Sequence, residues 1–333
     1  MTVTLKDVAE RAGVSRSAVS RTFTPGASVS AKTRSKVEQA AAELGYAPSA
    51  LASGLSTGRT KLIGLVSNNF RNPIFLEVFD LFTRAIQDRG LRPLLVNLSE
   101  DTDPEAAIRM LRQYSVDAVI VASSTLSAAF AANCKAAGLP VVHAFGRATR
   151  YPEVPVVGID NVEAGRMAAR ALLARGYRDI GFLGGPAGAT TTQDRLAGFR
   201  QELARHPGCR LRESFASTYS HDAGAVEMSR LMDSGPLAEA YFCGDDVIAI
   251  GALGVLRKAG REVPGDVGLI GFNDMEAASW DLVTLTTIRQ PLDEIIAVSV
   301  GQAIALSEQP ETPVTQTLLP LTLIERGTLR PEM

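Results

Sequence analysis

The sequence of 333 residues predicts an all-α head of three short helices, followed by an α/β body of two doubly wound parallel-sheet lobes. Within residues 1–60, helix-capping residues and glycines stand at helical spacing. From Lys61 onward, short apolar runs alternate with helical stretches, which is typical of α/β domains. A body of roughly 270 residues exceeds one comfortable core, so we expect two lobes.

The first helix of the head is predicted to start after Thr4. The segment Thr4-Leu5-Lys6-Asp7 fits a capping box, in which two residues satisfy each other's backbone N–H groups. An apolar face continues through Val8, Ala9 and Ala12. Gly13 is expected to end this helix, because glycine accepts the left-handed conformation of a helix stop.

A second helix is predicted directly after a tight Gly13-Val14 turn, with Ser15 as its N-cap. Ala18 and Val19 can face inward, whereas the remaining polar side chains cannot all be buried. Its outer face is therefore polar and basic, formed by Arg16, Ser17, Ser20 and Arg21.

Ser30 is expected to cap a third helix that ends at Gly45. Its apolar residues Val37, Ala40, Ala41 and Leu44 fall at i, i+3, i+4 and i+7. Two helices joined by a glycine turn and closed by a third form a helix-turn-helix. The second helix of this motif enters the major groove of DNA.

The charge distribution supports a nucleic-acid partner at the N-terminal end. Residues 1–60 carry eight basic and four acidic side chains, and the other residues carry 26 and 32. The overall net charge of −2 therefore hides a basic head on an acidic body. Charge alone would equally fit an ordinary solvated helical surface, but the turn, the caps and the basic outer face favour DNA.

The head resembles the lactose/galactose repressor (LacI/GalR) family in a dense and ungapped set of motifs, Thr4-Leu5-Lys6-Asp7-Val8-Ala9, Ala12-Gly13-Val14-Ser15, Val19-Ser20-Arg21, Val29-Ser30, Thr33-Arg34 and Leu44-Gly45-Tyr46-Ala47-Pro48. This resemblance implies that Arg16 and Ser17 read bases, with Ser20 and Arg21 beside them. Arginine suits the O6 and N7 atoms of guanine. Phosphate contacts, which fix register without reading sequence, are implied for Ser15, Ser30, Thr33 and Tyr46. Thr4 is also expected to be a DNA-binding residue.

Residues 47–60 form a linker after the helix-turn-helix domain of residues 1–46. The linker is small and polar, and Gly54 lowers helix stability by about 1 kcal/mol relative to alanine, so we expect disorder without a partner. The resemblance implies a hinge helix that forms on operator DNA and inserts Leu55 into the minor groove as a wedge. Ser49 stands where asparagine is usual in the family. Together with Gly54, this departure predicts a hinge helix that does not form readily. Residues 54–58 also fit the nucleophile elbow of hydrolases, but no strand precedes them and no long helix follows.

Seven apolar runs in the body are suited to strands buried on both faces, namely Leu62–Val66, Leu94–Leu98, Ala118–Val121, Val141–Ala144, Ile180–Leu183, Ala240–Cys243 and Val267–Phe272. Between them lie predicted helices, including Leu76–Arg89, Glu105–Tyr114, Ala164–Arg175, Arg195–Arg205 and Val247–Ala259.

The body also resembles the family, through Asn72-Pro73-Ile74-Phe75, Asp160-Asn161, Arg195-Leu196-Ala197-Gly198-Phe199, Asp245-Asp246, Gly271-Phe272-Asn273-Asp274 and Leu285-Thr286-Thr287-Ile288-Arg289-Gln290-Pro291. This resemblance implies a periplasmic-binding-protein-like fold that binds effector and dimerises over residues 61–333. Lobe one would take about 61–160 and 290–320, and lobe two about 161–289 and 321–329. The cleft between two such lobes is the natural ligand site.

Arg195, expected at the mouth of a helix, can donate a fork of hydrogen bonds to two hydroxyls or a carboxylate. The family motifs extend the effector-binding role to Asn72, Phe75, Arg147, Tyr219, Asp245, Asn273 and Gln290. Aromatic faces, amides and carboxylates suit a polyol. Taken singly, Phe75 is more often a core residue, and either arginine can be a surface ion-pair partner.

The sequence departs from the family pattern at three positions in this set. Relatives usually have asparagine in place of Asp245 and aspartate in place of Asn273, so carboxylate and amide are exchanged while the local charge is kept. Gly146 replaces a polar residue, which removes a hydroxyl partner and is expected to leave space. A neutral sugar or polyol fits best, and Arg147 and Arg195 would also tolerate a sugar acid.

Other chemistries have little support. Cys134, Cys209 and Cys243 are widely spaced without a CxxC pair, which argues against disulfides and zinc and fits a reducing cytoplasm. His143, His206 and His221 lack metal-ligand spacing. Residues 181–188 lack the Lys-Ser/Thr of a phosphate-binding loop. We expect no cofactor, no metal and no catalytic set, and Asp245 and Asp246 suit a helix cap plus a ligand contact.

The sequence therefore predicts a cytoplasmic, dimeric transcription regulator, a repressor that binds a pseudo-palindromic operator and responds to a small sugar-like effector. No signal peptide or apolar stretch of about 18 residues is present, which argues against an exported sugar-binding protein and a membrane partner. A sugar-modifying enzyme is the other alternative, without a catalytic set to support it. No leucine heptads follow the last strand pattern, so a dimer is expected. Induction and corepression are both compatible with these residues.

Overall fold

This computed structural model describes residues 3–24, 26–47, 58–68, 70–98 and 102–333. The chain divides into two compact units, one of Met1–Lys61 with Ser115–Asp117 and one of Leu62–Tyr114 with Ala118–Met333. Within the described residues, no helix is both long and apolar enough to cross a membrane.

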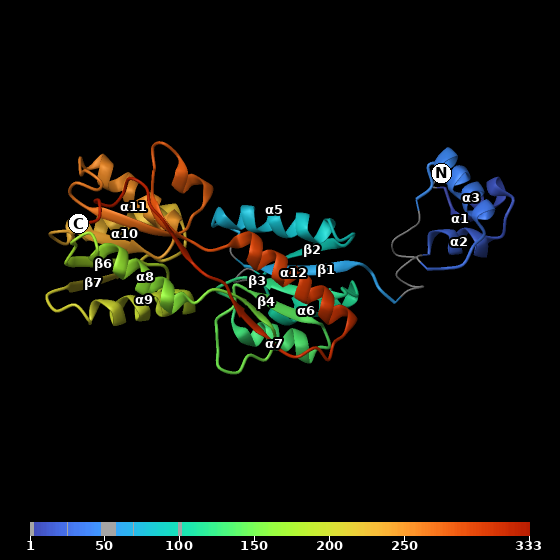
Figure 1. The fold of residues 1–333 in the computed structure, drawn as a ribbon, viewed down its shortest axis with the longest axis horizontal. Coiled ribbons are helices and arrows are strands. Elements are labelled where there is room, and N and C mark those ends of the chain that lie inside the picture. The colour runs from blue at the N-terminus through green and yellow to red at the C-terminus, as the bar shows by residue number, and fades with distance from the viewer. Residues whose placement is uncertain (1–2, 25, 48–57, 69, 99–101) are drawn as a thin grey trace. The chain divides into compact units, whose positions relative to one another are not determined.

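The head contains the three predicted helices, α1 (Leu5–Ala12), α2 (Arg16–Phe23) and α3 (Ala31–Leu44), drawn in blue in Figure 1. The predicted capping box is present, since Thr4 Oγ1 accepts from the N–H of Asp7 (3.4 Å) and Asp7 accepts from the N–H of Thr4 (2.8 Å). Gly13 and Gly45 end α1 and α3 with φ of 66° and 65°, a region that favours glycine.

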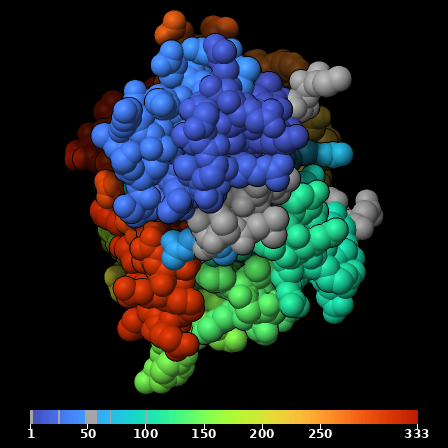
Figure 2. Space-filling model, turned by 90° about the vertical axis from the view of Figure 1, so that its right-hand side faces the viewer, coloured from blue at the N-terminus to red at the C-terminus, as the bar shows by residue number. Residues whose placement is uncertain are grey.

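The head has its own small core. Val8, Val19 and Val37, one from each helix, are completely buried, and Ala9, Ala40 and Ala41 join them. The Phe23 and Tyr46 rings pack with centroids 5.9 Å apart. The three helices form one continuous surface in the space-filling view (Figure 2). Packing of apolar side chains from all three helices stabilises a unit whose helices are too short to be stable alone.

The C-terminal end of this unit is fixed by one carboxylate. Asp117 Oδ1 accepts from the N–H of Thr60 and Asp117 Oδ2 from the N–H of Lys61, both over 2.9 Å. The hydroxyl of Thr60 also donates to the carbonyl of Ser115 (2.7 Å). The segment that leads into the first strand of the body is thus held at two consecutive backbone positions.

The body consists of two six-stranded sheets, each the centre of one lobe. In lobe one the strand order is β11-β5-β4-β3-β1-β2, and all neighbours are parallel. These strands are β1 (Leu62–Ser67), β2 (Arg92–Asn97), β3 (Ala118–Ala122), β4 (Val141–Ala144), β5 (Val156–Gly158) and β11 (Gln316–Leu318).

In lobe two the order is β12-β10-β9-β8-β6-β7, with only β10 and β12 antiparallel. The strands are β6 (Asp179–Gly184), β7 (Arg210–Phe215), β8 (Ala240–Cys243), β9 (Gly268–Asn273), β10 (Thr286–Arg289) and β12 (Thr322–Ile324). The chain crosses between the lobes three times, after β5, β10 and β11 (Figure 1).

Helices cover both sheets. Lobe one has α5 (Ile74–Gln87), α6 (Pro104–Gln113), α7 (Ala128–Ala136) and α12 (Leu292–Glu308), and lobe two has α8 (Asn161–Leu173), α9 (Thr190–Leu203), α10 (His221–Asp233), α11 (Asp246–Lys258) and the 3₁₀ helix η1 (Glu276–Ser279). Helices α8 and α9 lie unusually close. A Cβ on Gly165 would stand 1.9 Å from the carbonyl oxygen of Arg195, and one on Gly198 would stand 1.8 Å from that of Val162. Only glycine permits this approach, which brings Arg195 on α9 next to the start of α8.

The α/β class and the seven predicted strands are confirmed, with ends that differ by one or two residues. The predicted start of α9 was wrong, because the helix begins at Thr190 and Arg195 lies in its second turn rather than at its mouth. Three consecutive threonines, which have weak helix propensity, conceal the first turn in the sequence. The polar edge strand β7, the four-residue strand β10 and the three-residue strands β5, β11 and β12 were not among the expected elements.

Candidate functional site

Helix α2 presents the polar face that the sequence predicts. Val19 is buried and Ala18 is half-buried, while Arg16, Ser17, Ser20 and Arg21 are exposed. Arg21 Nε lies 3.3 Å from the carbonyl of Ser17, and Arg16 has no ion-pair or hydrogen-bond partner among the described residues. An unpaired arginine on an exposed helix face is free to donate its fork to a guanine edge.

The predicted phosphate contacts cluster at helix N-termini. Thr4, Ser15 and Ser30 are the N-caps of α1, α2 and α3. Ser15 Oγ accepts from the N–H of Ala18 and Ser30 Oγ from that of Thr33, both over 3.2 Å. Hydroxyls beside unpaired backbone N–H groups at a positive dipole end suit phosphate oxygens. Tyr46 instead lies half-buried against Phe23. Leu55, the predicted wedge, lies outside the described residues.

A cavity of ≈ 40 Å³ lies between the two lobes. Of the eight predicted effector residues, it is lined by seven, namely Asn72, Phe75, Arg195, Tyr219, Asp245, Asn273 and Gln290. The sequence interpretation missed its other lining residues, Ile74, Val78, Ser124, Phe145, Ile159, Asn161 and Thr191. Asn161 stood in a recognised motif and follows the helix cap Asp160, so it carried a usable signal. The others are apolar or hydroxyl side chains with nothing local to distinguish them.

Arg195 is buried at the floor of this cavity. Its Nε donates to Asn161 Oδ1 (2.9 Å) and its Nη1 to the carbonyl of Gly244 (2.6 Å). The guanidinium carbon lies 3.5 Å from the centroid of the Phe272 ring. Burial lowers the pKa of this guanidinium. Since Nη2 has no hydrogen-bond partner within the described part of the chain, Arg195 keeps donors for a ligand.

Asp245 is the acceptor at the centre of the cavity wall. Its Oδ2 accepts from Asn72 Nδ2 (2.8 Å) and Asn273 Nδ2 (2.9 Å), and its Oδ1 caps α11 by accepting from the N–H of Val247 (2.9 Å). Gln290 Nε2 in turn donates to Asn273 Oδ1 (2.7 Å). Burial raises the pKa of Asp245 to about 6, although these N–H donors favour its charged form.

The neighbouring Asp246 points away from the cavity, as its expected structural role requires. Thr287 Oγ1 donates to its Oδ1 (2.5 Å) and the N–H of Met275 to its Oδ2 (2.9 Å). Burial and the nearby Asp245 raise the pKa of Asp246 to about 7. This carboxylate ties α11 to β10 and to the start of η1.

Arg147 is the predicted effector residue that does not line the cavity. Its guanidinium makes a two-pronged contact with Asp194 on α9, through Nε to Oδ2 (2.9 Å) and Nη2 to Oδ1 (2.5 Å). Arg147 follows β4 of lobe one and Asp194 belongs to lobe two, so this ion pair joins the lobes. The hydrogen bond between Asn72 and Asp245 joins them as well.

The expectation that Gly146 leaves space was wrong. A Cβ there would lie 2.8 Å from the ring of His143, so that ring already fills the position. His143 is buried, and its Nε2 lies 3.0 Å from the carbonyl oxygen of Ser123. Burial lowers the pKa of His143, which favours the neutral ring.

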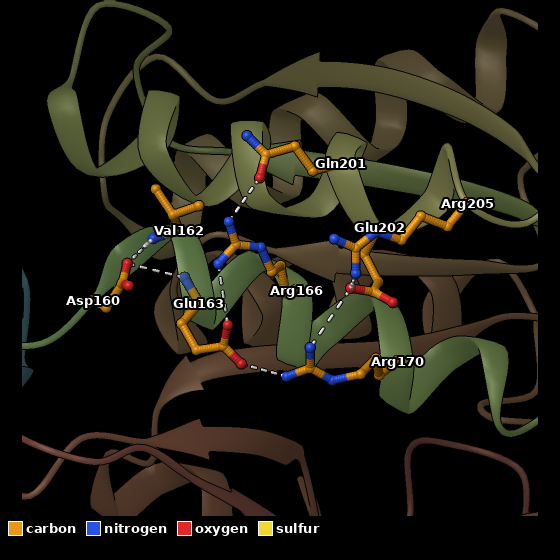
Figure 3. A network of polar contacts seen from close by, with 8 residues as sticks. All are labelled: Asp160, Val162, Glu163, Arg166, Arg170, Gln201, Glu202 and Arg205. Carbon is orange, nitrogen blue, oxygen red and sulfur yellow. Dashed lines mark hydrogen bonds and ion pairs between the residues drawn. The ribbon is translucent and has the colours of Figure 1, made fainter.

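Polar contacts between α8 and α9 hold the floor of the site (Figure 3). Asp160 caps α8, accepting from the N–H groups of Val162 (2.9 Å) and Glu163 (3.0 Å). Arg166 bridges Glu163 and Gln201, and Arg170 bridges Glu163 and Glu202 (Figure 3). Asn161, the first residue of α8, accepts the hydrogen bond from Arg195 of α9, so these bridges connect the same two helices. Within the described residues, no group of histidine, cysteine or acidic side chains could hold a metal ion.

Comparisons with known proteins assign the chain to a family. Residues 4–49 match the family described as bacterial regulatory proteins, lacI family, and residues 169–329 match a periplasmic binding protein-like domain. The chain is 33% identical to the HTH-type transcriptional regulator CelR of Thermobifida fusca over 299 residues, 87% of each protein. It is 30% identical to the ribose operon repressor of Escherichia coli (strain K12) over 341 residues, covering 97% of this chain and 99% of the repressor.

Solved structures give the same result. The lac repressor dimer bound to operator and the anti-inducer ONPF superposes with a TM-score of 0.89 at 27% identity, covering 99% of this chain and 100% of that one. A complex of the transcriptional regulator CelR with cellobiose has a TM-score of 0.73 at 29% identity, with 98% and 99% covered. The similarity thus spans the head and both lobes.

Proposed function

Because the chain belongs to the LacI family of bacterial regulatory proteins, we propose that it represses transcription from an operator of two inverted half-sites under the control of a small sugar-like effector. It is a DNA-binding transcriptional regulator, as its named relatives are. One observation carries the proposal: the same chain pairs an exposed basic recognition helix with an interlobe cavity that combines arginine, carboxylate and amide groups.

On the DNA side, Arg16 and Ser17 contact base edges, with Ser20 and Arg21 beside them. Thr4, Ser15, Ser30, Thr33 and Tyr46 contact phosphates, and Leu55 acts as the minor-groove wedge. A homodimer presents two recognition helices related by a two-fold axis, so its operator is a pseudo-palindrome. Operator DNA is the partner, which makes the cytoplasm the place of action.

On the effector side, a polyhydroxylated ligand fits the donors and acceptors of the cavity. Arg195 Nη2 and the amides of Asn72, Asn273 and Gln290 donate, while Asp245 accepts from ligand hydroxyls. Phe75 and Tyr219 offer aromatic faces to sugar C–H groups. The CelR complex contains cellobiose and another relative represses a ribose operon, so sugars are effectors or targets within this family.

The ligand and the lobe contacts compete for the same groups. Asn72 and Asp245 bind each other across the cleft, and a ligand hydroxyl at either group changes that contact. The effector thereby changes the angle between the lobes and the spacing of the two heads. The effector site and the DNA-binding site are thus coupled by a free energy of interaction. Depending on its sign, effector binding weakens operator binding (induction) or strengthens it (corepression).

Two measurements test the proposal. Selection from random double-stranded DNA should enrich an inverted repeat, and failure to enrich one contradicts the operator. A thermal-shift screen of sugars, polyols and sugar acids should identify a ligand, which calorimetry then compares between the wild type and Arg195→Ala. Removal of the Arg195 guanidinium should cost about 1.5 to 3 kcal/mol of binding free energy for each hydrogen bond lost. If two bonds are lost, a site of micromolar affinity becomes too weak to detect. Unchanged affinity would place the effector elsewhere.

A further inference from the structure

A second cavity adjoins the one that Arg195 and Asp245 line. It has a volume of ≈ 600 Å³, against ≈ 40 Å³ for the first. We call the two the outer compartment and the inner compartment. The polar residues of the outer compartment are Asn68, Thr102, Thr125, Ser217, Thr218 and Tyr219. Most of them follow strands β1, β3 and β7, at the carboxyl edge of the sheets where ligands bind in doubly wound folds.

The two compartments are parts of one cleft. Tyr219 lines both of them. After β3, Ser124 lines the inner compartment and the next residue, Thr125, lines the outer one. At the start of α9, Thr191 lines the inner compartment and Ala189 the outer one. The two compartments therefore adjoin at Tyr219, at the end of β3 and at the start of α9.

The volumes indicate how a ligand would be divided between the compartments. A volume of ≈ 40 Å³ accommodates only a few water molecules, so a sugar ring enters the inner compartment only when Asn72 and Asp245 separate. The outer compartment, at ≈ 600 Å³, falls within the range of sites that hold whole small molecules. A molecule anchored by Arg195 thus has room for a second unit next to its first ring.

The described part of the outer lining offers hydrogen-bonding groups without charge. Asn68 Oδ1 accepts from Ser123 Oγ (2.7 Å) and Thr125 Oγ1 (3.0 Å), which leaves its amide nitrogen as a donor for a ligand. Among the residues that the structure describes, none of those lining this compartment is charged. Its chemistry suits neutral hydroxyl groups rather than a carboxylate or phosphate.

Tyr219 forms a rigid aromatic wall at the junction. Its hydroxyl is held between Thr191 Oγ1 (2.9 Å) and Thr192 Oγ1 (2.7 Å), and a Cβ on Gly185 would lie 2.4 Å from its ring. The ring is therefore fixed at both its edge and one face. A fixed ring that borders both compartments provides a surface on which sugar C–H groups pack.

We propose that the effector of this chain is an uncharged molecule of at least two sugar-sized units, one bound in the inner compartment and the other in the outer compartment against Tyr219. This inference rests on the proposed sugar effector and narrows its size and charge. It predicts neutral two-ring sugars or glycosides as effectors and excludes single-ring sugars and sugar acids.

The test uses the full-length dimer and matched sugars. Glucose and galactose are compared by calorimetry with the two-ring sugars cellobiose, maltose and lactose, on the wild type and on two variants of the exposed residue Ser217. Ser217→Trp fills the outer compartment, and Ser217→Ala removes only the hydroxyl. We expect at least one two-ring sugar to bind at least tenfold more tightly than either single-ring sugar. Ser217→Trp should abolish that advantage, whereas Ser217→Ala should keep it within about threefold.

The outcomes separate this inference from the function on which it rests. Binding of single-ring sugars with no gain from a second ring would overturn the two-compartment assignment and leave the sugar effector intact. The two-compartment assignment is also overturned if Ser217→Trp binds the preferred two-ring sugar as tightly as Ser217→Ala does. Equal melting temperatures of the two variants show that both are folded. If no sugar of the set binds or alters operator affinity, the proposed effector class is itself contradicted.

Discussion

Asn273 donates a hydrogen bond to Asp245 over 2.9 Å, and these are the two positions at which we expect amide and carboxylate to be exchanged relative to the family pattern. The exchange therefore occurs within one contacting pair, so one donor and one acceptor are kept. Asn273 has φ 115°, which places its side chain under backbone constraint at the end of β9. We therefore expect substitutions at these two positions to have coupled effects on effector affinity.

Exchanging the pair tests this coupling. Asn273→Asp alone sets two carboxylates against each other in a buried site. Asp245→Asn alone replaces one of the two acceptor oxygens with an N–H donor, so the bonds from Asn72, Asn273 and the N–H of Val247 cannot all be kept. We expect each single variant to lose at least tenfold in effector affinity. The double variant should recover most of that loss, with an interaction energy of about 1 to 3 kcal/mol. Additive losses in calorimetry would show that the contact is incidental.

Effector affinity should depend on pH through Asp245. Its pKa in the free protein is about 6 because of burial, and hydroxyl donors of a ligand favour the ionised carboxylate. Binding therefore lowers this pKa, so affinity should fall as pH decreases below about 6 and should level off above about 7. Asp245→Asn should bind more weakly with a flatter profile. Calorimetry between pH 5 and 8 measures this dependence. A wild-type affinity that is constant over this range would rule out Asp245 as a charged acceptor for the effector.

Stability should depend on pH through Asp246. Its pKa is about 7 in the folded chain, against an ordinary aspartate value of 3.8, because the side chain is buried. The folded state therefore binds the proton more tightly than the unfolded state. The free energy of unfolding should decrease as pH rises from about 4 to 7, by up to about 4 kcal/mol, and should then level off.

Asp246→Asn retains an oxygen for the N–H of Met275 and removes the titrating group. Its urea midpoint should vary less with pH than that of the wild type over the same interval. Asp222→Asn, at an exposed position on α10, is the matched control and should follow the wild type. Parallel profiles for all three proteins would refute the assignment to Asp246.

Arg16 should determine one base pair of the operator. Arg16→Ala removes a two-pronged contact worth about 1 to 3 kcal/mol and should relax preference at that base pair. Lys36→Ala removes the same charge from an exposed position on α3, so its loss should be smaller and equal on all sequences. Electrophoretic mobility assays on the selected operator and its single-base variants make the comparison. Equal, sequence-independent losses for both variants would make Arg16 a phosphate contact.

The ion pair between Arg147 and Asp194 should act as a clasp between the lobes. Its side chains are 47% and 14% exposed, so solvent limits its contribution to roughly 1 kcal/mol. Arg147→Gln and Asp194→Asn should therefore change effector affinity in the same direction, by about two- to fivefold, and the double variant should resemble each single one. If only Arg147→Gln weakens binding in titrations, Arg147 contacts the ligand directly.

The sequence by itself determined the helices of the head and most of the strands at the centre of each sheet. Caps such as Thr4 and Ser30, the helix-ending Gly13 and Gly45, and the apolar spacing of each helix act over a few residues, so the local sequence contains the information. Strands that are buried on both faces are continuous apolar runs for the same reason. Edge and three-residue strands such as β7 and β11 have no such run, because their pairing depends on a neighbour far away in the chain.

Tertiary structure alone decided the partners within the cleft. Asn72 and Asp245 are 173 residues apart and meet only because two lobes close on each other. Arg147 carried the same chemical signal as Arg195, yet one pairs with Asp194 and the other lies at the floor of the cavity. The His143 ring occupies the space beside Gly146. Side-chain type sets which contacts are chemically possible, and the packing of elements distant in sequence selects which of them form.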